Sequence, residues 1–214
     1  MKIKWLGHAS FLITTQDGKK IITDPYTPGD GINYKPIVES ADIVTSSHSH
    51  GDHNNTQAVK GSPTVIAQSG SRTVKGIEFK TVPVFHDETG GKQRGKNLIF
   101  CFKADGLSLC HLGDLGHPLD QQQLADIRPV DVLFIPVGGF YTIDAKAASE
   151  IAGLIQAKLI FPMHYKTPMT DYPIKGVDEF LRDKKNIRRV GSSEVEVNKD
   201  SLPKGEEIVV LQPA

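Results

Sequence analysis

A short segment of the chain gathers four side chains that can bind a metal ion. It follows an apolar run at residues 41–45 and reads His48-Ser49-His50-Gly51-Asp52-His53. Imidazole nitrogens suit Zn, Fe or Ni, and a carboxylate can bridge two ions. The alternative interpretation is a polar turn with solvated histidines. We favour a divalent-cation site, because so dense a cluster is rare by chance in a chain with 8 histidines.

Further ligands must come from elsewhere, because one loop cannot complete the shells of two ions. The candidates share one position, since each follows an apolar stretch that reads as a strand. They are His86, Asp114 and His164. Polar groups after neighbouring strands meet at one edge of a sheet, so we expect these three to join the cluster. Asp24 occupies a similar position and is predicted to accept the other N–H of a ligand histidine.

The elements that position these residues read as short strands with a few helices. Apolar runs and alternation predict strands at residues 3–5, 11–13, 20–23, 41–45, 64–67, 77–85, 97–103, 107–112, 130–137, 158–163 and 207–211. Helices are predicted at residues 119–127, 145–157 and 177–185, with an N-cap at 142–144 for the second. Residues 25–38 read as an irregular loop. Together these elements indicate one α/β domain over residues 1–214, with sheets sandwiched by outer helices.

Composition narrows the class of protein. The 25 Lys+Arg residues balance the 25 Asp+Glu residues, so a long nucleic-acid partner is not expected. No apolar run of about 18 residues exists, and polar Lys4, His8 and Ser10 interrupt the N-terminal stretch. We therefore predict a cytoplasmic protein with no membrane partner. Its 2 cysteines are too few for a disulfide framework.

The metal-binding motifs resemble those of the metallo-β-lactamase superfamily, whose H-x-H-x-D-H signature matches residues 48–53. Within that superfamily the chain looks like the small UlaG-like (UPF0173-type) metal-dependent hydrolases, from residue 1 to about residue 170. The segments that carry this second resemblance are Gly7-His8-Ala9-Ser10, Thr23-Asp24-Pro25, His111-Leu112-Gly113-Asp114 and Pro162-Met163-His164-Tyr165. The resemblance implies a four-layer αβ/βα sandwich, with two mixed sheets flanked by helices.

The same resemblance implies a dinuclear centre. The first metal would bind His48, His50 and His86, the second would bind Asp52, His53 and His164, and Asp114 would bridge the two. Asp24 and His8 would hold ligands in place without binding a metal. The implied cofactors are two divalent cations, with zinc favoured and manganese, iron and nickel as alternatives.

Two cations in such a centre lower the pKa of a shared water from 15.7 towards about 7. The resulting hydroxide would attack a small ester, lactone or phosphodiester, and Asp52 is the predicted catalytic residue because it can hold the nucleophile. Tyr141 and Tyr165 are candidate substrate contacts. Arg94 is a third, because its planar guanidinium suits an anionic group and its glycine-rich loop at residues 89–96 follows His86. A loop of solvated charges is the alternative interpretation.

Other functions stay open from the sequence. The same site could serve a thioester or nucleic-acid hydrolase, or a metal-binding or redox protein without hydrolytic turnover. His50 stands where flavin-linked diiron relatives carry a glutamate, which favours hydrolysis. We expect a small, anionic substrate, and a homo-oligomer is compatible with the sequence. The residues after about 170 carry no functional signal.

Two more predictions concern a hairpin near the site. Asp105-Gly106 reads as a two-residue turn, which would make Cys101 and Cys110 reduced cross-strand neighbours. His111 is an inviting ligand candidate just before Asp114. We expect it instead to be a strand histidine held by hydrogen bonds.

Overall fold

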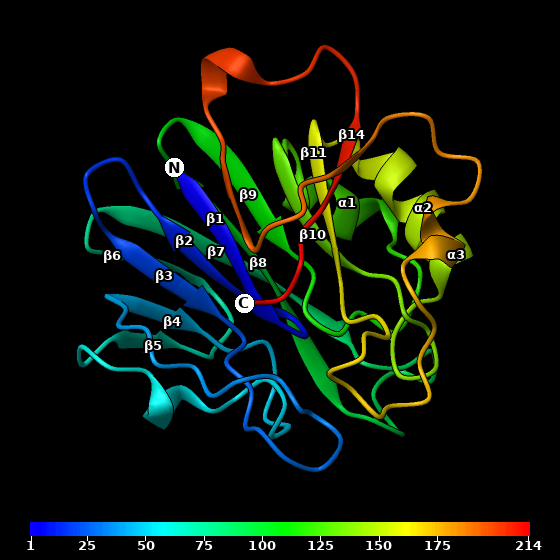
Figure 1. The fold of residues 1–214 in the computed structure, drawn as a ribbon, viewed down its shortest axis with the longest axis horizontal. Helices are drawn as coiled ribbons and strands as arrows, with labels where there is room; N and C mark the ends of the chain where they lie inside the picture. The colour runs from blue at the N-terminus through cyan, green and yellow to red at the C-terminus, as the bar shows by residue number, and fades with distance from the viewer.

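The computed structural model describes residues 1–214, and two mixed sheets face each other within it (Figure 1). The first sheet has the strand order β13-β1-β2-β3-β4-β5. Its strands are β1 (Lys2–Gly7), β2 (Ser10–Thr14), β3 (Lys20–Thr23), β4 (Ile43–Thr45), β5 (Thr64–Ile66) and β13 (Glu194–Glu196). The neighbours from β13 to β3 pair antiparallel, whereas β3, β4 and β5 pair in parallel.

The second sheet has the strand order β12-β14-β11-β10-β9-β8-β7-β6. Its strands are β6 (Ser71–Val74), β7 (Ile77–Phe85), β8 (Lys96–Ala104), β9 (Leu107–His111), β10 (Val132–Pro136), β11 (Leu159–Met163), β12 (Ile187–Arg189) and β14 (Glu207–Val210). Strands β6, β7, β8 and β9 pair antiparallel. From β9 on, the neighbours β10, β11, β14 and β12 pair in parallel. The continuously apolar β10 and β11 are fully buried, as central parallel strands should be.

Three α-helices lie beside the second sheet (Figure 1). They are α1 (Gln121–Ile127), α2 (Ala145–Ile155) and α3 (Asp178–Leu181). Asp144 is the predicted N-cap of α2, and its Oδ1 accepts a 2.8 Å hydrogen bond from the Ala147 amide. The helix expected at 177–185 is a single turn, because Asp183 has a φ of 65° and the residues from 182 to 185 are all charged. No helix has the length and apolar character needed to cross a bilayer.

Alternation along the first sheet divides its side chains between two apolar clusters. Ile3 and Trp5 of β1 belong to the large core shared by the two sheets. Leu6 and Leu12 belong to a smaller cluster on the other face of the first sheet. That cluster is completed by loop side chains, namely Tyr26, Ile32, Tyr34 and Ile37.

The expected sandwich is therefore present, with one difference in its outer layers. No α-helix precedes Gln121, so loop side chains cover the outer face of the first sheet, and the 3-10 turn η1 (Thr56–Ala58) in this part of the chain has no buried residue. Prolines and glycines between residues 25 and 38 prevent a regular helix there. A second 3-10 turn, η2 (Lys199–Ser201), lies near the C-terminus.

The hairpin of β8 and β9 has the predicted register. Ala104 pairs with Leu107 and Cys101 pairs with Cys110. Both thiols are free, and their sulfur atoms are 3.8 Å apart. The cross-strand neighbour prediction is confirmed.

Candidate metal centre

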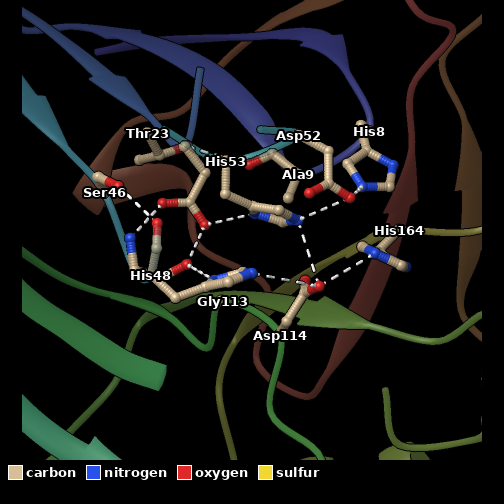
Figure 2. A network of polar contacts seen from close by, with 12 residues as sticks. His8, Ala9, Thr23, Ser46, His48, Asp52, His53, Gly113, Asp114 and His164 are labelled. Atoms are coloured by element: carbon tan, nitrogen blue, oxygen red, sulfur yellow. Dashed lines mark hydrogen bonds and ion pairs between the residues drawn. The ribbon is translucent and has the colours of Figure 1, made fainter. Parts of the chain in front are cut away.

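The site lies where strands from both sheets end. In the first sheet β1, β3 and β4 are parallel to one another. In the second sheet β7, β9 and β11 are likewise parallel to one another. Their carboxyl ends bring the side chains that follow them to one edge, where they point toward one another (Figure 2). The chain positions brought together are His8, Asp24, residues 48–53, His86, Asp114 and His164.

Potential ligand atoms form three overlapping groups, and within each group all atoms lie within 4.8 Å of one another. The groups are His48, His50 and His86; His8, Asp52, His53 and His164; and His48, His53 and Asp114. The first matches the set that the sequence resemblance assigns to one metal. The second contains the set assigned to the other metal, with His8 in addition.

Asp114 lies between the first two groups. Its Oδ2 is 3.1–3.2 Å from the Nε2 atoms of three histidines, His53, His86 and His164. Burial would raise the pKa of this carboxyl, but His164 and His53 outweigh burial and hold the pKa well below its usual value. An ionised carboxylate in this place can share its oxygens between two cations.

Several buried ligand atoms have no hydrogen-bond partner. They include Nε2 of His48, His53 and His164, and Oδ1 of Asp114. Each buried polar atom left unsatisfied costs about 1–3 kcal/mol, so a cluster of them is costly unless a ligand engages it. Imidazole nitrogens combined with carboxylate oxygens are a donor set that suits zinc and related divalent ions. The residues present therefore fit metal cations.

Protonation states differ across the cluster. Burial, reinforced by the charge of His53, lowers the pKa of His48 to about 3, which leaves its imidazole neutral. Burial also lowers the pKa of His53, but Asp114 and Asp52 outweigh it and raise the pKa well above the usual value. Burial raises the pKa of Asp52, yet His53 and His8 hold it well below normal. His53 is thus the ligand candidate at which a proton competes most with a cation.

Asp24 positions two of these histidines from behind. Its Oδ2 accepts the Nδ1 hydrogen of His53 at 2.9 Å and the Ser47 hydroxyl at 2.6 Å, and its Oδ1 accepts the Ser47 amide at 2.8 Å. The Ser47 hydroxyl in turn lies 2.9 Å from Nδ1 of His48. Asp24 is fully buried, so it lies where the sequence predicts a partner for a ligand histidine.

Asn97 fixes the backbone at Asp114. Its Oδ1 accepts the Asp114 amide at 3.0 Å, and its Nδ2 donates to the Leu112 carbonyl at 2.9 Å. Gly113 has a φ of 55°, and a Cβ there would collide with Asn97 Oδ1. This contact explains why a glycine precedes the bridging candidate. Sequence reasoning missed Asn97, because an asparagine at the start of a strand carries no distinctive signal.

His111 is held by hydrogen bonds at both ring nitrogens. Its Nε2 donates to the Ala9 carbonyl at 2.8 Å, and its Nδ1 accepts the Gly113 amide at 3.1 Å. Neither nitrogen is left for a metal, and His111 belongs to none of the ligand groups.

Comparison with known proteins agrees with this geometry. The family model of the beta-lactamase superfamily domain matches residues 2–164. A UPF0173 metal-dependent hydrolase from Carboxydothermus hydrogenoformans is 32% identical, and the match covers 78% of this chain and 85% of that protein. Another, from Methanoculleus marisnigri, is 32% identical and covers 98% of this chain and 97% of its own. The chain belongs to the UPF0173 family of metal-dependent hydrolases, within the metallo-β-lactamase superfamily.

This UPF0173 protein is also similar to solved structures over most or all of its fold. A Thermotoga maritima structure described as a candidate Zn-dependent hydrolase of the metallo-β-lactamase superfamily is 41% identical, with a TM-score of 0.83. That match covers 100% of this chain and 99% of the other. Igni18, a metallo hydrolase from Ignicoccus hospitalis, is 23% identical with a TM-score of 0.61 over 84% of this chain and 88% of its own, and shares the fold.

A pocket of about 330 Å³ opens onto the metal centre of this UPF0173 hydrolase. Arg94, Tyr141 and Tyr172 line it together with the ligand candidates His50, Asp52, His86, Asp114 and His164. The Arg94 guanidinium lies 5.4 Å from the centre of the Tyr141 ring and forms no ion pair. Arg94 and Tyr141 thus lie where a substrate contact is expected.

Asp87 organises the loop that carries Arg94. Its carboxylate accepts hydrogen bonds from the amides of Thr89, Gly91, Gln93 and Arg94, at 2.8–3.0 Å. A loop tied to one buried carboxylate in this way holds a defined shape. The guanidinium of Arg94 is therefore presented from a fixed backbone, although Lys92 and Lys96 of the same loop are exposed.

Two tyrosines depart from the sequence-based expectations. Tyr165 is buried in the core with its ring 5.2 Å from that of Trp5, and it does not line the pocket. The prediction of a substrate contact there is wrong, and the φ of 52° at His164 shows that the chain turns between the two residues. Tyr172 lines the pocket instead, with its hydroxyl 3.4 Å from Asp52 Oδ2. It lies beyond the segment that carried the resemblance, in a stretch without periodicity.

Proposed function

We propose that this protein is a dinuclear, zinc-dependent hydrolase of the UlaG-like type that cleaves a small anionic ester, lactone or phosphodiester. The observation that carries the proposal is the position of Asp114 between two ligand groups at the floor of a pocket whose wall presents Arg94. The seven ligands predicted from the sequence all belong to these groups and exceed the four that one tetrahedral zinc takes, which favours two ions.

Each residue would have a definite role. His48, His50 and His86 would hold one cation, Asp52, His53 and His164 would hold the other, and Asp114 would bind both. Bound divalent cations supply Lewis acidity and lower the pKa of a coordinated water towards about 7. Asp52 lines the pocket, and its carboxylate can hold the nucleophile by accepting a hydrogen bond from it. The hydroxyl groups of Tyr141 and Tyr172 can donate hydrogen bonds to substrate oxygens.

Charge on either side of the pocket supports an anionic substrate. A groove of about 900 Å³ adjoins the pocket at His50 and Arg94, contains Lys96 and has no carboxylate in its lining. On the opposite side a groove of about 520 Å³, which also reaches Arg94, contains several carboxylates, including those of Glu88 and Glu150. An anionic group is attracted to the first groove and repelled by the second.

Metal analysis combined with a substrate panel tests the proposal. We expect about two zinc equivalents per chain, and hydrolysis of bis-p-nitrophenyl phosphate or of a charged lactone in preference to a thioester. Asp114→Asn, which removes the shared carboxylate with little change of shape, is the control for the site. A protein that binds two cations and hydrolyses none of these compounds would support the alternative of a metal-binding or redox protein. If the protein preferred the thioester, the proposed substrate class would be wrong and a thioester hydrolase would take its place.

A further inference from the structure

His8 is buried in the metal centre without a hydrogen bond at either ring nitrogen. Its side chain has no exposed surface, and both Nδ1 and Nε2 lack a partner. Nε2 lies 3.3 Å from Asp52 Oδ2, but the contact is not aligned as a hydrogen bond. A buried imidazole normally satisfies at least one nitrogen, as His111 does with both. The ring of His8 therefore lacks the partner that its environment requires.

The backbone of His8 is held in a conformation that aims the ring at the site. His8 follows β1 and has a φ of 52°, a left-handed conformation that non-glycine residues adopt at a cost of about 1–2 kcal/mol. Its carbonyl accepts hydrogen bonds from the Trp5 indole at 3.0 Å and from the His164 amide at 3.1 Å. The second bond ties His8 directly to the backbone of a ligand candidate. The fold thus maintains a strained residue at this point.

The ring also lies at the spacing that ligands of one ion have. His8 shares a ligand group with Asp52, His53 and His164, and its ring centre is 4.1 Å from that of His164. Two tetrahedral ligands that are each about 2.1 Å from a zinc ion lie about 3.4 Å apart. Asp52 Oδ2 is 3.3 Å from Nε2 of His8 and 3.7 Å from Nε2 of His53.

We propose that His8 binds the second cation directly through Nε2. This half of the centre then has four protein ligands of its own, His8, Asp52, His53 and His164, in addition to the shared Asp114. The sequence predicts only a supporting role for His8, and the 3.3 Å contact with Asp52 would give that role the form of a hydrogen bond to this carboxylate. The two roles differ in what happens to the bound metal when the imidazole is removed.

Metal affinity of the His8→Gln variant separates these roles. The amide nitrogen of glutamine reaches about as far as Nε2 and can still donate a hydrogen bond to Asp52, but glutamine lacks the imidazole nitrogen. We expect the zinc or cobalt ion held by Asp52, His53 and His164 to bind at least about tenfold more weakly, with the affinity of the other ion unchanged. Competition with a chromophoric chelator measures both affinities without reference to activity. Wild-type affinity for both equivalents would overturn the proposal.

His111→Asn is the matched control. It removes another buried imidazole, one that supports the same turn through the Ala9 carbonyl but belongs to no ligand group. If the loss of affinity came from loosening the turn, His111→Asn would weaken the binding of this ion as much as His8→Gln does, and the proposal would fail.

A crystal structure of the zinc-loaded wild-type protein gives an answer that needs no variant. We expect a distance of about 2.0–2.1 Å between His8 Nε2 and the second zinc. A distance beyond about 3 Å, with Nε2 donating to Asp52, would assign His8 a positioning role and overturn direct ligation. The proposed hydrolytic reaction can hold under either outcome.

Discussion

The two halves of the metal centre differ in how far the protein encloses them. His48, His50 and His86 form an open half, because His50 is exposed and borders both the pocket and the groove beside it. Asp52, His53 and His164 form a closed half, in which His53 and His164 are buried and His8 fills the remaining side. For the proposed dinuclear centre, we expect the closed half to retain its cation and the open half to exchange ligands with substrate and solvent.

The closed half also has the more direct hydrogen bond between a ligand histidine and a buried carboxylate. Asp24, itself buried, binds Nδ1 of His53 directly, whereas its link to His48 passes through the Ser47 hydroxyl. The Nδ1 atoms of His86 in the open half and His164 in the closed half are both buried with no partner, so the difference in support rests on His53. A carboxylate behind a ligand imidazole fixes the tautomer and raises its basicity. Burial and support together predict tighter binding in the closed half.

Loss of the shared ligand should have the largest effect. It should weaken both halves, so that they no longer differ in metal affinity. Asp114→Asn removes the charge that both halves share, so we expect both cations to bind weakly and activity to fall by more than about 100-fold. His111→Asn, which changes a neighbouring imidazole outside the site, should cost far less. Activity assays and metal analysis of the two variants check this. Equal losses in both, with intact folding, would remove Asp114 from the bridging position.

Loss of the support behind His53 should affect one half more than the other. Asp24→Asn keeps the shape and tolerates the φ of 39° at this position, but it weakens the acceptor for the Nδ1 hydrogen. We expect affinity for the closed-half cation to fall by about 10–100-fold, with a smaller change in the open half. Titration of the metal-free variant with cobalt, followed by its absorption bands, measures the two steps. Equal weakening of both steps would show that Ser47 transmits the effect fully to His48.

Removal of the cations should destabilise the fold in two stages. A ligand present at 100 times its Kd stabilises the native state by about 2.7 kcal/mol. For a chain of this length that is worth about 5–10 °C in Tm. Graded chelation should first release the open-half cation with little change in Tm, and then release the closed-half cation with most of that change. Calorimetry at several chelator concentrations checks the order, and one simultaneous loss would show that the halves do not differ.

Most of the site could be predicted because its residues follow apolar strands. A strand such as β11 is recognisable from its composition, and a polar residue at its end has one edge of the sheet to occupy. His86, Asp114 and His164 were expected at the site for this reason. Tyr172 was not expected, because its place depends on a long irregular segment after β11 that contacts the turn at residues 29–33.

The same reasoning explains which parts of the fold sequence patterns missed. β6, β12 and β13 are short and mostly exposed, so they contain almost no apolar signal. Each becomes a strand only because a neighbouring strand offers an edge, as β1 does for β13. The ligand role proposed for His8 is equally hidden, because a backbone hydrogen bond between residues 156 positions apart joins His8 to His164.

The smallest expected effect lies at the pocket wall, where the open half meets the substrate. Arg94→Ala removes a guanidinium that has no ion-pair partner and faces the pocket beside Tyr141. We expect KM for anionic substrates to rise about tenfold, because a charge-assisted hydrogen bond contributes about 1.5–3 kcal/mol and solvent near the surface reduces that value. The turnover number and both metal affinities should stay close to wild type, because Arg94 belongs to no ligand group. Lys92→Ala, an exposed charge in the same loop, is the control that should leave KM unchanged. Steady-state kinetics on a charged and a neutral ester with the same leaving group test whether Arg94 recognises charge. An equal rise in KM for both esters would mean that Arg94 shapes the pocket without recognising charge.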